Sequence, residues 1–178
     1  MFFGGFGLKL IPSNSGPIAD KISTVPIDEN LLGLSIRINE ASTSLHRKIK
    51  EANLNLPPVE LFDSDFSYKT PGRRMSWIVT NRDNSLITIV IYRDVLAPLN
   101  SDEIQAFALH DLCHLVLGHL DDNPLTRKPR NVQMEKDADK CAVDSGINPK
   151  VMVSTINKLV PDSDWRVQRL NALIGPDK

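Results

Sequence analysis

The chain has 178 residues, of which 41% are hydrophobic and 24% are charged, and its formal net charge is −1. This length and balance are typical of a single globular domain with a hydrophobic core. The near-zero charge gives no reason to expect a nucleic-acid partner, and no apolar run is long enough to form a transmembrane segment.

Residues 1–28 are predicted to form an irregular N-terminal arm, and residues 29–178 one domain. The arm begins with Phe2, Phe3 and Phe6 among glycines and continues through a stretch rich in Pro, Ser and Gly. It lacks the positive n-region and the cleavage site of a signal peptide. We expect the arm to pack on the domain or to mediate self-association, and weak anchoring to a membrane surface is the alternative.

The first half of the domain predicts one helix and a small sheet. Behind Asp28, a suitable N-cap, hydrophobic residues recur with helical spacing until residues 53–58 end the helix. Asn84 and Ser85 suit a tight reversal between two strands, so we expect a small, mainly antiparallel sheet. Short β-branched and aromatic segments predict its strands, at Val59–Phe62, Trp77–Thr80 and Leu86–Tyr92.

The second half predicts helices. Asn100 and Glu103 have the spacing of a capping box at the start of a helix that continues to about His119. Residues 120–131 contain two prolines and three basic residues, which predict a loop.

A second helix is expected from about Val132 to Gly146, and Asn148 and Ser163 are expected to cap two further short helices. The order of one helix, a small sheet and then several helices predicts an α+β domain.

Three of the four histidines lie close together, in the segment HDLCHLVLGH. His110 and His114 are four positions apart on the predicted helix, so both imidazoles project from one face. Two neutral ring nitrogens at this spacing can bind one Zn²⁺ at about 2.0–2.1 Å. Asp111 occupies the position where the H-E-x-x-H motif carries its general-base glutamate. The motif therefore predicts zinc with Asp111 as general base, and a pair of ordinary, partly buried histidines is the alternative.

The next helix supplies a candidate third ligand. A catalytic zinc ion takes three protein ligands and keeps a fourth position open for water. Glu135 is the expected third ligand, because the loop before it is long enough to reverse the chain. Asp139 lies one turn further on the same face and is expected to accept the other ring N–H of a ligand histidine, which fixes its tautomer. The alternative is that both carboxylates form a solvated acidic face.

His119 misses by one position the spacing at which metzincins carry their third histidine. It follows His114 by five residues, well round the helix from the ligand face. We interpret His119 as a helix-end residue favoured by the helix dipole, or as a group that supports a ligand from behind.

Cys113 and Cys141 are too few for a disulfide framework and favour a reducing compartment, so the predicted location is the cytoplasm. We expect both to be buried free thiols that pack as small hydrophobic residues. The alternative is that Cys113 is a fourth metal ligand, which would close the site to water.

Together these motifs resemble the HtpX-like peptidases, the family that includes the CAAX prenyl endopeptidases, and especially their small soluble members, the minigluzincins. The likeness covers residues 76–173, through ITIVIYRDVLAPLNSDEIQAFALHDLCHLVLGH, MEKDADKCAVDSGINP and PDSDWRVQRLNAL. It implies a zincin-like (gluzincin) fold with an active-site helix, a Glu-bearing helix and C-terminal helices. The implied activity is that of a zinc endopeptidase, with one zinc ion held by His110, His114 and Glu135.

The resemblance also implies that a strand near Met75–Thr80 forms the sheet edge that pairs with a peptide or protein substrate. It places Arg166 near the zinc, where this residue would steady an oxyanion or hold a substrate carboxylate. A salt bridge from Arg166 to Asp162 or Asp164 is the alternative.

Two positions depart from the family pattern. Asp111 replaces the glutamate that activates water, which shortens the general base by one methylene. Val160 stands where the family usually has a histidine beside Pro161, which removes a transition-state donor. The leading hypothesis is a zinc-dependent metallopeptidase, and the first alternative is a catalytically weak or inactive pseudopeptidase that acts as a metal-holding binding or regulatory protein.

A further alternative starts from the same residues. His110 and Asp111 also form an HD dyad, as in metal-dependent phosphohydrolases, with His46 and Asp139 as candidate ligands. Because HD domains are all-helical, the predicted strands argue against this interpretation. A purely regulatory protein that docks through its Phe-rich arm is the last alternative.

Overall fold

The structure is a computed structural model that describes residues 29–65, 75–119, 131–160 and 164–174. The expected N-terminal arm lies outside the described residues, as do Asp28, Ser163 and all but the last residue of the predicted loop at 120–131.

The described segments form an α+β fold, as the sequence predicts. Their elements, in chain order, are α1 (Glu29–Glu51), β1 (Val59–Ser64), β2 (Ser76–Thr80), β3 (Ile87–Tyr92), α2 (Arg93–Leu96), α3 (Ser101–Val116), α4 (Val132–Asp144), α5 (Pro149–Leu159) and α6 (Asp164–Ile174). The short helix α2 is the one element among these that the sequence analysis does not predict. None of the described helices is both long and apolar enough to cross a membrane.

The three strands pair in the order β1-β3-β2, with β1 parallel and β2 antiparallel to β3. The sheet is therefore mixed, and the expectation of a mainly antiparallel sheet is wrong. The turn at Asn84, whose φ is 55°, joins β2 to β3 as expected. The alternation of residue types fixes which face of each strand is buried, but it does not fix which strand takes the centre.

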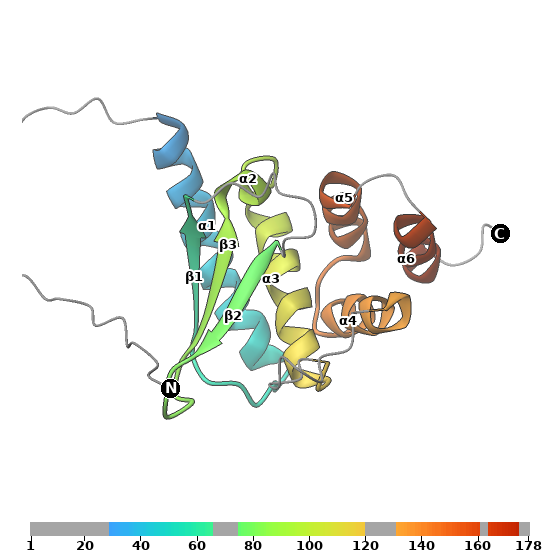
Figure 1. Cartoon of the computed structure of the whole chain (residues 1–178), viewed down its shortest axis with the longest axis horizontal. Coiled ribbons are helices and arrows are strands. Elements are labelled where there is room, and N and C mark those ends of the chain that lie inside the picture. Colours follow the sequence, from blue (N-terminus) through green and yellow to red (C-terminus); the bar gives the residue numbers. More distant parts are fainter. Residues whose placement is uncertain (1–28, 66–74, 120–130, 161–163, 175–178) are drawn as a thin grey trace, which may run out of the picture.

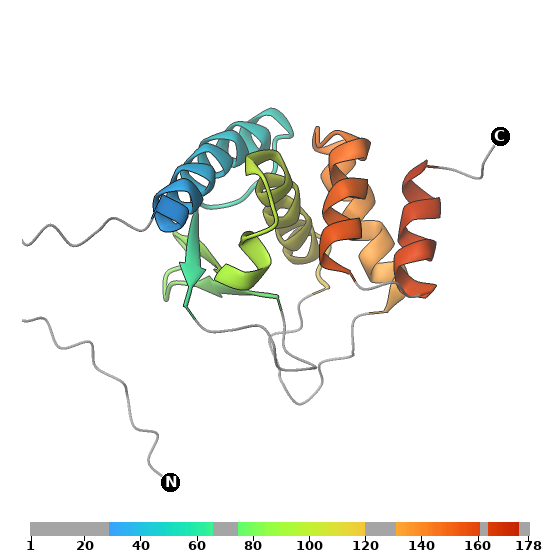
Figure 2. The same ribbon diagram turned by 90° about the horizontal axis from the view of Figure 1, so that it is seen from above.

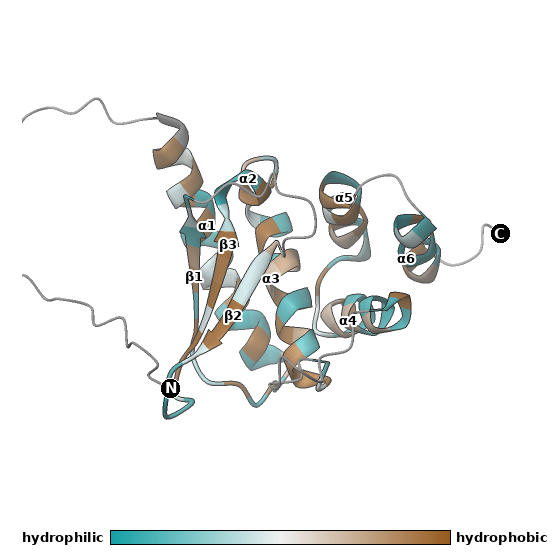
Figure 3. Ribbon diagram, in the orientation of Figure 1, coloured by the Kyte–Doolittle hydropathy of each residue, from teal (hydrophilic) through white to brown (hydrophobic). Residues whose placement is uncertain are grey.

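One face of the sheet carries the core. Leu61, Ile89 and Ile78 lie in register across the three strands, and Ile87, Ile89 and Ile91 of β3 are almost fully buried. Figure 3 shows the hydropathy of the strands and helices. Helix α1 runs across this face, as the view from above shows (Figure 2). Strand β2 lies at a sheet edge, as the resemblance implies for a strand near Met75–Thr80.

Helix α3 is the central element of the fold. Asn100 and Glu103 form the expected capping box at its start, and every residue from Glu103 to His114 is buried. The sheet and α1 lie on one side of α3, and α4, α5 and α6 lie on the other (Figure 1). A helix buried along most of its length has a fixed position, so its polar side chains are held by packing on both sides.

The two cysteines are joined in a disulfide, which corrects the expectation of free thiols. Cys113 on α3 and Cys141 on α4 have Cα atoms 5.9 Å apart. Helical spacing gives the direction of each residue relative to its own helix, but it does not show that the two directions meet once α3 and α4 pack. The bond also leaves Cys113 without the thiolate that a fourth metal ligand would need.

Candidate metal centre

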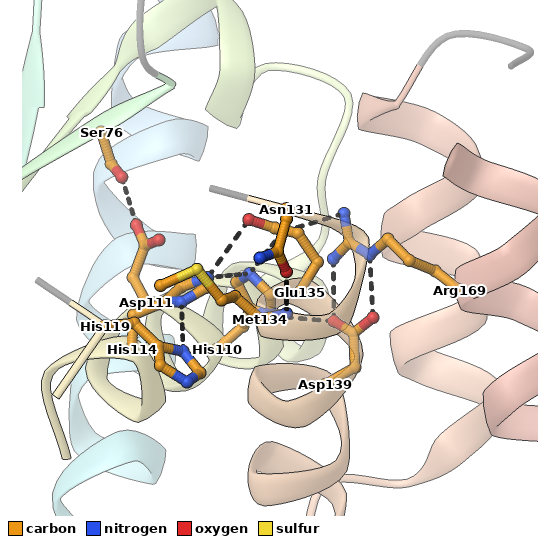
Figure 4. A network of polar contacts seen from close by, with 10 residues as sticks. All are labelled: Ser76, His110, Asp111, His114, His119, Asn131, Met134, Glu135, Asp139 and Arg169. Atoms are coloured by element: carbon orange, nitrogen blue, oxygen red, sulfur yellow. Dashed lines mark hydrogen bonds and ion pairs between the residues drawn. The ribbon is translucent and has the colours of Figure 1, made fainter. Parts of the chain in front are cut away.

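Two imidazoles from α3 form one side of the candidate site. His110 and His114 are 5% and 0% exposed, so both rings are withdrawn from solvent. Their Nε2 atoms are 3.1 Å apart and converge on one point (Figure 4). The one-turn spacing that the sequence predicts therefore does bring the two ring nitrogens together.

Glu135 reaches the same point from α4. The side chain of Asn131 accepts a hydrogen bond from the backbone N–H of Met134, which starts α4 and places Glu135 in its first turn. One carboxylate oxygen of Glu135 lies 3.3 Å from Nε2 of His110, and the other lies 3.4 Å from Nε2 of His114.

This donor set fits a metal ion. One ligand atom from each of His110, His114 and Glu135 lies within 4.8 Å of the others, and no other group of this kind occurs among the described residues. Two imidazole nitrogens and one carboxylate oxygen are ligands that divalent transition metals accept. Their convergence in a buried place is the expected geometry of a three-residue metal site.

Asp139 supports His110 from behind. Its Oδ1 atom lies 2.8 Å from Nδ1 of His110, on the opposite side of the ring from the ligand nitrogen. A carboxylate there fixes the ring orientation and keeps the proton on Nδ1, leaving Nε2 free for a metal ion. The side chain is 1% exposed, so Asp139 does not belong to a solvated face.

Arg169 on α6 completes the cluster, and the sequence analysis misses it. Its Nε and Nη2 atoms each donate a hydrogen bond of 2.8 Å to Asp139, and its Nη1 atom lies 3.4 Å from Glu135. Arg169 is buried at the same helix face as Arg166, which lies one turn earlier and is partly buried. The resemblance places Arg166 near the zinc, although Arg169 lies on the same face of α6. The role of Arg166 near the metal stays a prediction.

The charges of this cluster are strongly coupled. Burial lowers the pKa of His110, but its hydrogen bonds to Asp139 and Glu135 outweigh burial and raise that pKa to about 9. Burial raises the pKa of Glu135, but the two histidines outweigh it and hold that pKa well below the usual range. Burial likewise opposes the lowered pKa of Asp139, which Arg169 and His110 cause. Both carboxylates are therefore ionised, and a metal ion would displace a proton from His110.

His119 contacts the second ligand histidine. Gly118 has a φ of 68°, in the left-handed region that favours glycine, and the backbone N–H of His119 then donates to the carbonyl oxygen of His114 at 2.8 Å. This turn brings the His119 imidazole back along α3, so its Nδ1 atom lies 3.0 Å from Nδ1 of His114. His119 therefore contacts the outer nitrogen of a candidate ligand, and its role as a group that supports a ligand from behind stays a prediction.

Asp111 lies outside the three-residue group, on the side of α3 that faces the sheet. It is 2% exposed, and its carboxylate accepts a hydrogen bond from the hydroxyl of Ser76 on β2 (Figure 4). Burial lowers the pKa of Arg169, but the contacts with Asp139 and Glu135 outweigh burial and raise that pKa. The charge of Asp111 makes a smaller contribution in the same direction. Asp111 is thus close enough to act electrostatically on the cluster, and Ser76 is a contact that sequence reasoning did not find.

His46 does not join the cluster. Its Nε2 atom lies 2.6 Å from the carbonyl oxygen of Val59, which ties α1 to β1. Asp139 is occupied by Arg169 and by the outer nitrogen of His110. The ligand set that an HD-type site would need is therefore not assembled by these residues.

Comparison of the chain with known protein families, with curated proteins and with solved structures found no match.

Proposed function

We propose that this chain is a zinc-dependent metallopeptidase of the gluzincin kind, which hydrolyses peptide bonds and has the HtpX-like peptidases as its relatives. The observation that carries the proposal is the convergence of His110, His114 and Glu135 on one buried point, with Asp111 next to the first of them on α3. Two imidazoles and one carboxylate are the zinc ligands of several peptidase families, and this set leaves one coordination position for water.

The chain's own residues divide the remaining tasks. Asp139 and Arg169 fix the orientation of His110, and His119 supports His114. Asp111 would take a proton from the attacking water and return it to the leaving amine. Zinc, when bound, would supply Lewis acidity to the carbonyl and to water.

The free edge of the sheet offers a place for the substrate. Among the described strands, β2 pairs only with β3, so its other edge presents backbone N–H and C=O groups. An extended peptide could add to this edge as a further strand. Ser76 lies on β2 and contacts Asp111, so a peptide bound along β2 would lie beside the proposed base.

One observation favours the alternative of a weak or inactive pseudopeptidase. The Asp111 carboxylate is held by Ser76 on the sheet side of α3, and it is one methylene shorter than the glutamate expected there. Val160, which replaces the expected histidine, is a partly buried hydrophobic residue at the end of α5. Such a protein would still bind zinc and a peptide, but it would turn over slowly.

The predicted cytoplasmic location rests partly on two free thiols, and the disulfide between Cys113 and Cys141 removes that support. We retain the cytoplasm only as a proposal. The predicted self-association through the Phe-rich arm concerns residues outside the described segments.

The proposal is tested by incubating the purified chain with an unfolded polypeptide, before and after removal of metal and after restoration of zinc. We expect internal cleavages, identified by mass spectrometry, that disappear with the metal, return with zinc and are absent in Glu135→Ala. Stoichiometric zinc binding without cleavage would contradict the peptidase proposal and favour the pseudopeptidase. Cleavage that persists in Glu135→Ala would show that the activity belongs to a contaminant.

A further inference from the structure

The disulfide between Cys113 and Cys141 joins the two helices that carry the metal ligands. Cys113 directly precedes His114 on α3, and Cys141 lies less than two turns after Glu135 on α4. The two cysteines are 28 positions apart, and the segment between them includes the whole connection between these helices. It is the one disulfide of the chain, because both cysteines take part in it.

Helix α4 has little hydrophobic surface with which to hold its position. Its buried residues are Glu135, Ala138, Asp139 and Ala142. Two alanine side chains bury far less apolar area than the Leu, Ile and Phe residues that anchor α3. Partly buried Val143 and the cystine itself add to the contact. The attachment of α4 to α3 therefore depends mainly on the buried polar cluster and on the disulfide.

The polar cluster becomes weaker without a metal ion. Glu135 then meets two histidine nitrogens only at 3.3 Å and 3.4 Å, without the metal ion that would join the three side chains. Because the fully buried hydrophobic residues of α4 are two alanines, few buried apolar contacts oppose its local opening. The covalent bond limits how far α4 can move.

We propose that the Cys113–Cys141 disulfide is a redox-sensitive tether that holds α4 against α3 and thereby sets the affinity of the His110, His114 and Glu135 site for its metal ion. The inference rests on the metal-binding part of the proposed function and not on peptidase activity. Oxidation pre-organises the third ligand, so less conformational freedom is lost when the metal binds. Reduction releases α4, and the metal must then order it.

The burial of the two residues indicates how reduction proceeds. Cys113 is 0% exposed, whereas Cys141 is partly exposed. A dithiol reductant therefore attacks Sγ of Cys141 as a thiolate, forms a mixed disulfide and expels the Cys113 thiolate, which takes up a proton. The second thiol of the reductant then displaces Cys141 as a thiol. Two electrons and two protons pass to the protein, and the reductant leaves as its own disulfide.

The coupling has to be reciprocal. If oxidation tightens metal binding by some factor, bound metal must favour the disulfide over the two thiols by the same factor. A tenfold coupling corresponds to a shift of about 30 mV in the midpoint of this two-electron couple. The coupling can therefore be measured either as the change in zinc affinity on reduction or as the shift in the midpoint potential on zinc binding.

The experiment measures the dissociation constant of zinc by competition with a chromophoric chelator, for the full chain in oxidised form and after reduction with a phosphine, which does not compete for zinc as thiols do. We expect zinc binding to be at least about tenfold weaker after reduction. Cys141→Ser, in which the tether is absent, should match the reduced protein and should not respond to the phosphine. Equal dissociation constants, within about twofold, would overturn the inference.

Hydrogen exchange of the metal-free protein gives an independent measurement. Reduction should speed the exchange of α4 amides while those of α1, which lies on the other side of α3 from α4, stay protected, and zinc should restore the protection of α4. Equal acceleration of both helices would mean global destabilisation and would overturn the inference, as would unchanged exchange of α4. Zinc binding by neither redox form would overturn it as well. Zinc binding without peptide cleavage would contradict only the peptidase proposal.

Discussion

The hydroxyl of Ser76 on the edge strand donates a hydrogen bond to the carboxylate of Asp111, the residue that follows His110 on α3. This contact joins the sheet edge proposed for substrate to the proposed general base. It also turns the Asp111 carboxylate toward the sheet, so the length of this side chain decides how far it reaches toward the metal ligands. The prediction for Asp111 follows from this geometry.

Asp111→Glu should raise peptide turnover at least about tenfold, because one more methylene brings the carboxylate closer to the water it has to deprotonate. Zinc content should be unchanged, since residue 111 is not one of the three ligands. The measurement is kcat for a fluorogenic peptide, with zinc determined in the same samples. Asp111→Asn is the matched control and should abolish turnover. A variant Asp111→Glu no faster than the parent would mean that the site is shaped around Asp or is not a peptidase site.

Arg169→Ala should destabilise the metal-free protein by about 3–5 kcal/mol, because it leaves the buried carboxylate of Asp139 without its bidentate partner. Arg93→Ala is the control: this arginine pairs with Asp63, but its side chain is 36% exposed, so its loss should cost at most about 1 kcal/mol. Urea denaturation measures both. Similar losses in the two variants would show that the buried cluster does not hold α6 against α4.

His119→Ala should weaken zinc binding by about ten- to a hundredfold, because His114 then loses the partner at its outer nitrogen, Nδ1. Chelator competition gives the dissociation constant. Val116→Ala, at an exposed position in the last turn of the same helix, is the control and should bind zinc as the parent does. If both variants keep the parental affinity, the contact between the two imidazoles does not support the ligand.

The pH dependence of stability should have opposite signs with and without zinc. In the metal-free protein the pKa of His110 is raised to about 9 from 6.5, so its contribution to stability is present below about pH 6.5 and lost as the pH rises through 9. Zinc binding requires His110 without that proton, so zinc affinity should increase by up to about tenfold per pH unit over the same window. Thermal unfolding from pH 6.5 to 9.5 measures both effects. A metal-free protein whose stability is flat or rises across this range would contradict the raised pKa of His110.

Much of the fold could be predicted from the sequence, because the signals are local. The helical spacing that precedes residues 53–58, the capping box at Asn100 and Glu103, and the turn at Asn84 each lie within a few residues, and each is found in the structure. The parallel pairing of β1 with β3 was not predictable in this way. It depends on the path of the chain between β1 and β2, and the alternation within a strand does not encode that path.

The same distinction separates the parts of the site. His110 and His114 share one helix, so their spacing alone predicts that they meet, and the predicted partner Glu135 does reach them. The disulfide and the role of Arg169 depend on how α3, α4 and α6 pack against one another. Those contacts join residues 28 and 30 positions apart, and helical geometry within one element does not determine them.

Metal analysis of the purified chain tests the central claim most directly. We expect one zinc ion per chain after reconstitution, lost in both His114→Ala and Glu135→Ala, and retained in Lys140→Ala, which changes a side chain of α4 that is 74% exposed. Glu135 lies on a different helix from the histidines, so loss of zinc in Glu135→Ala would show that the ligands act as one site. Stoichiometric zinc in both ligand variants, or none in the parent, would contradict the assignment.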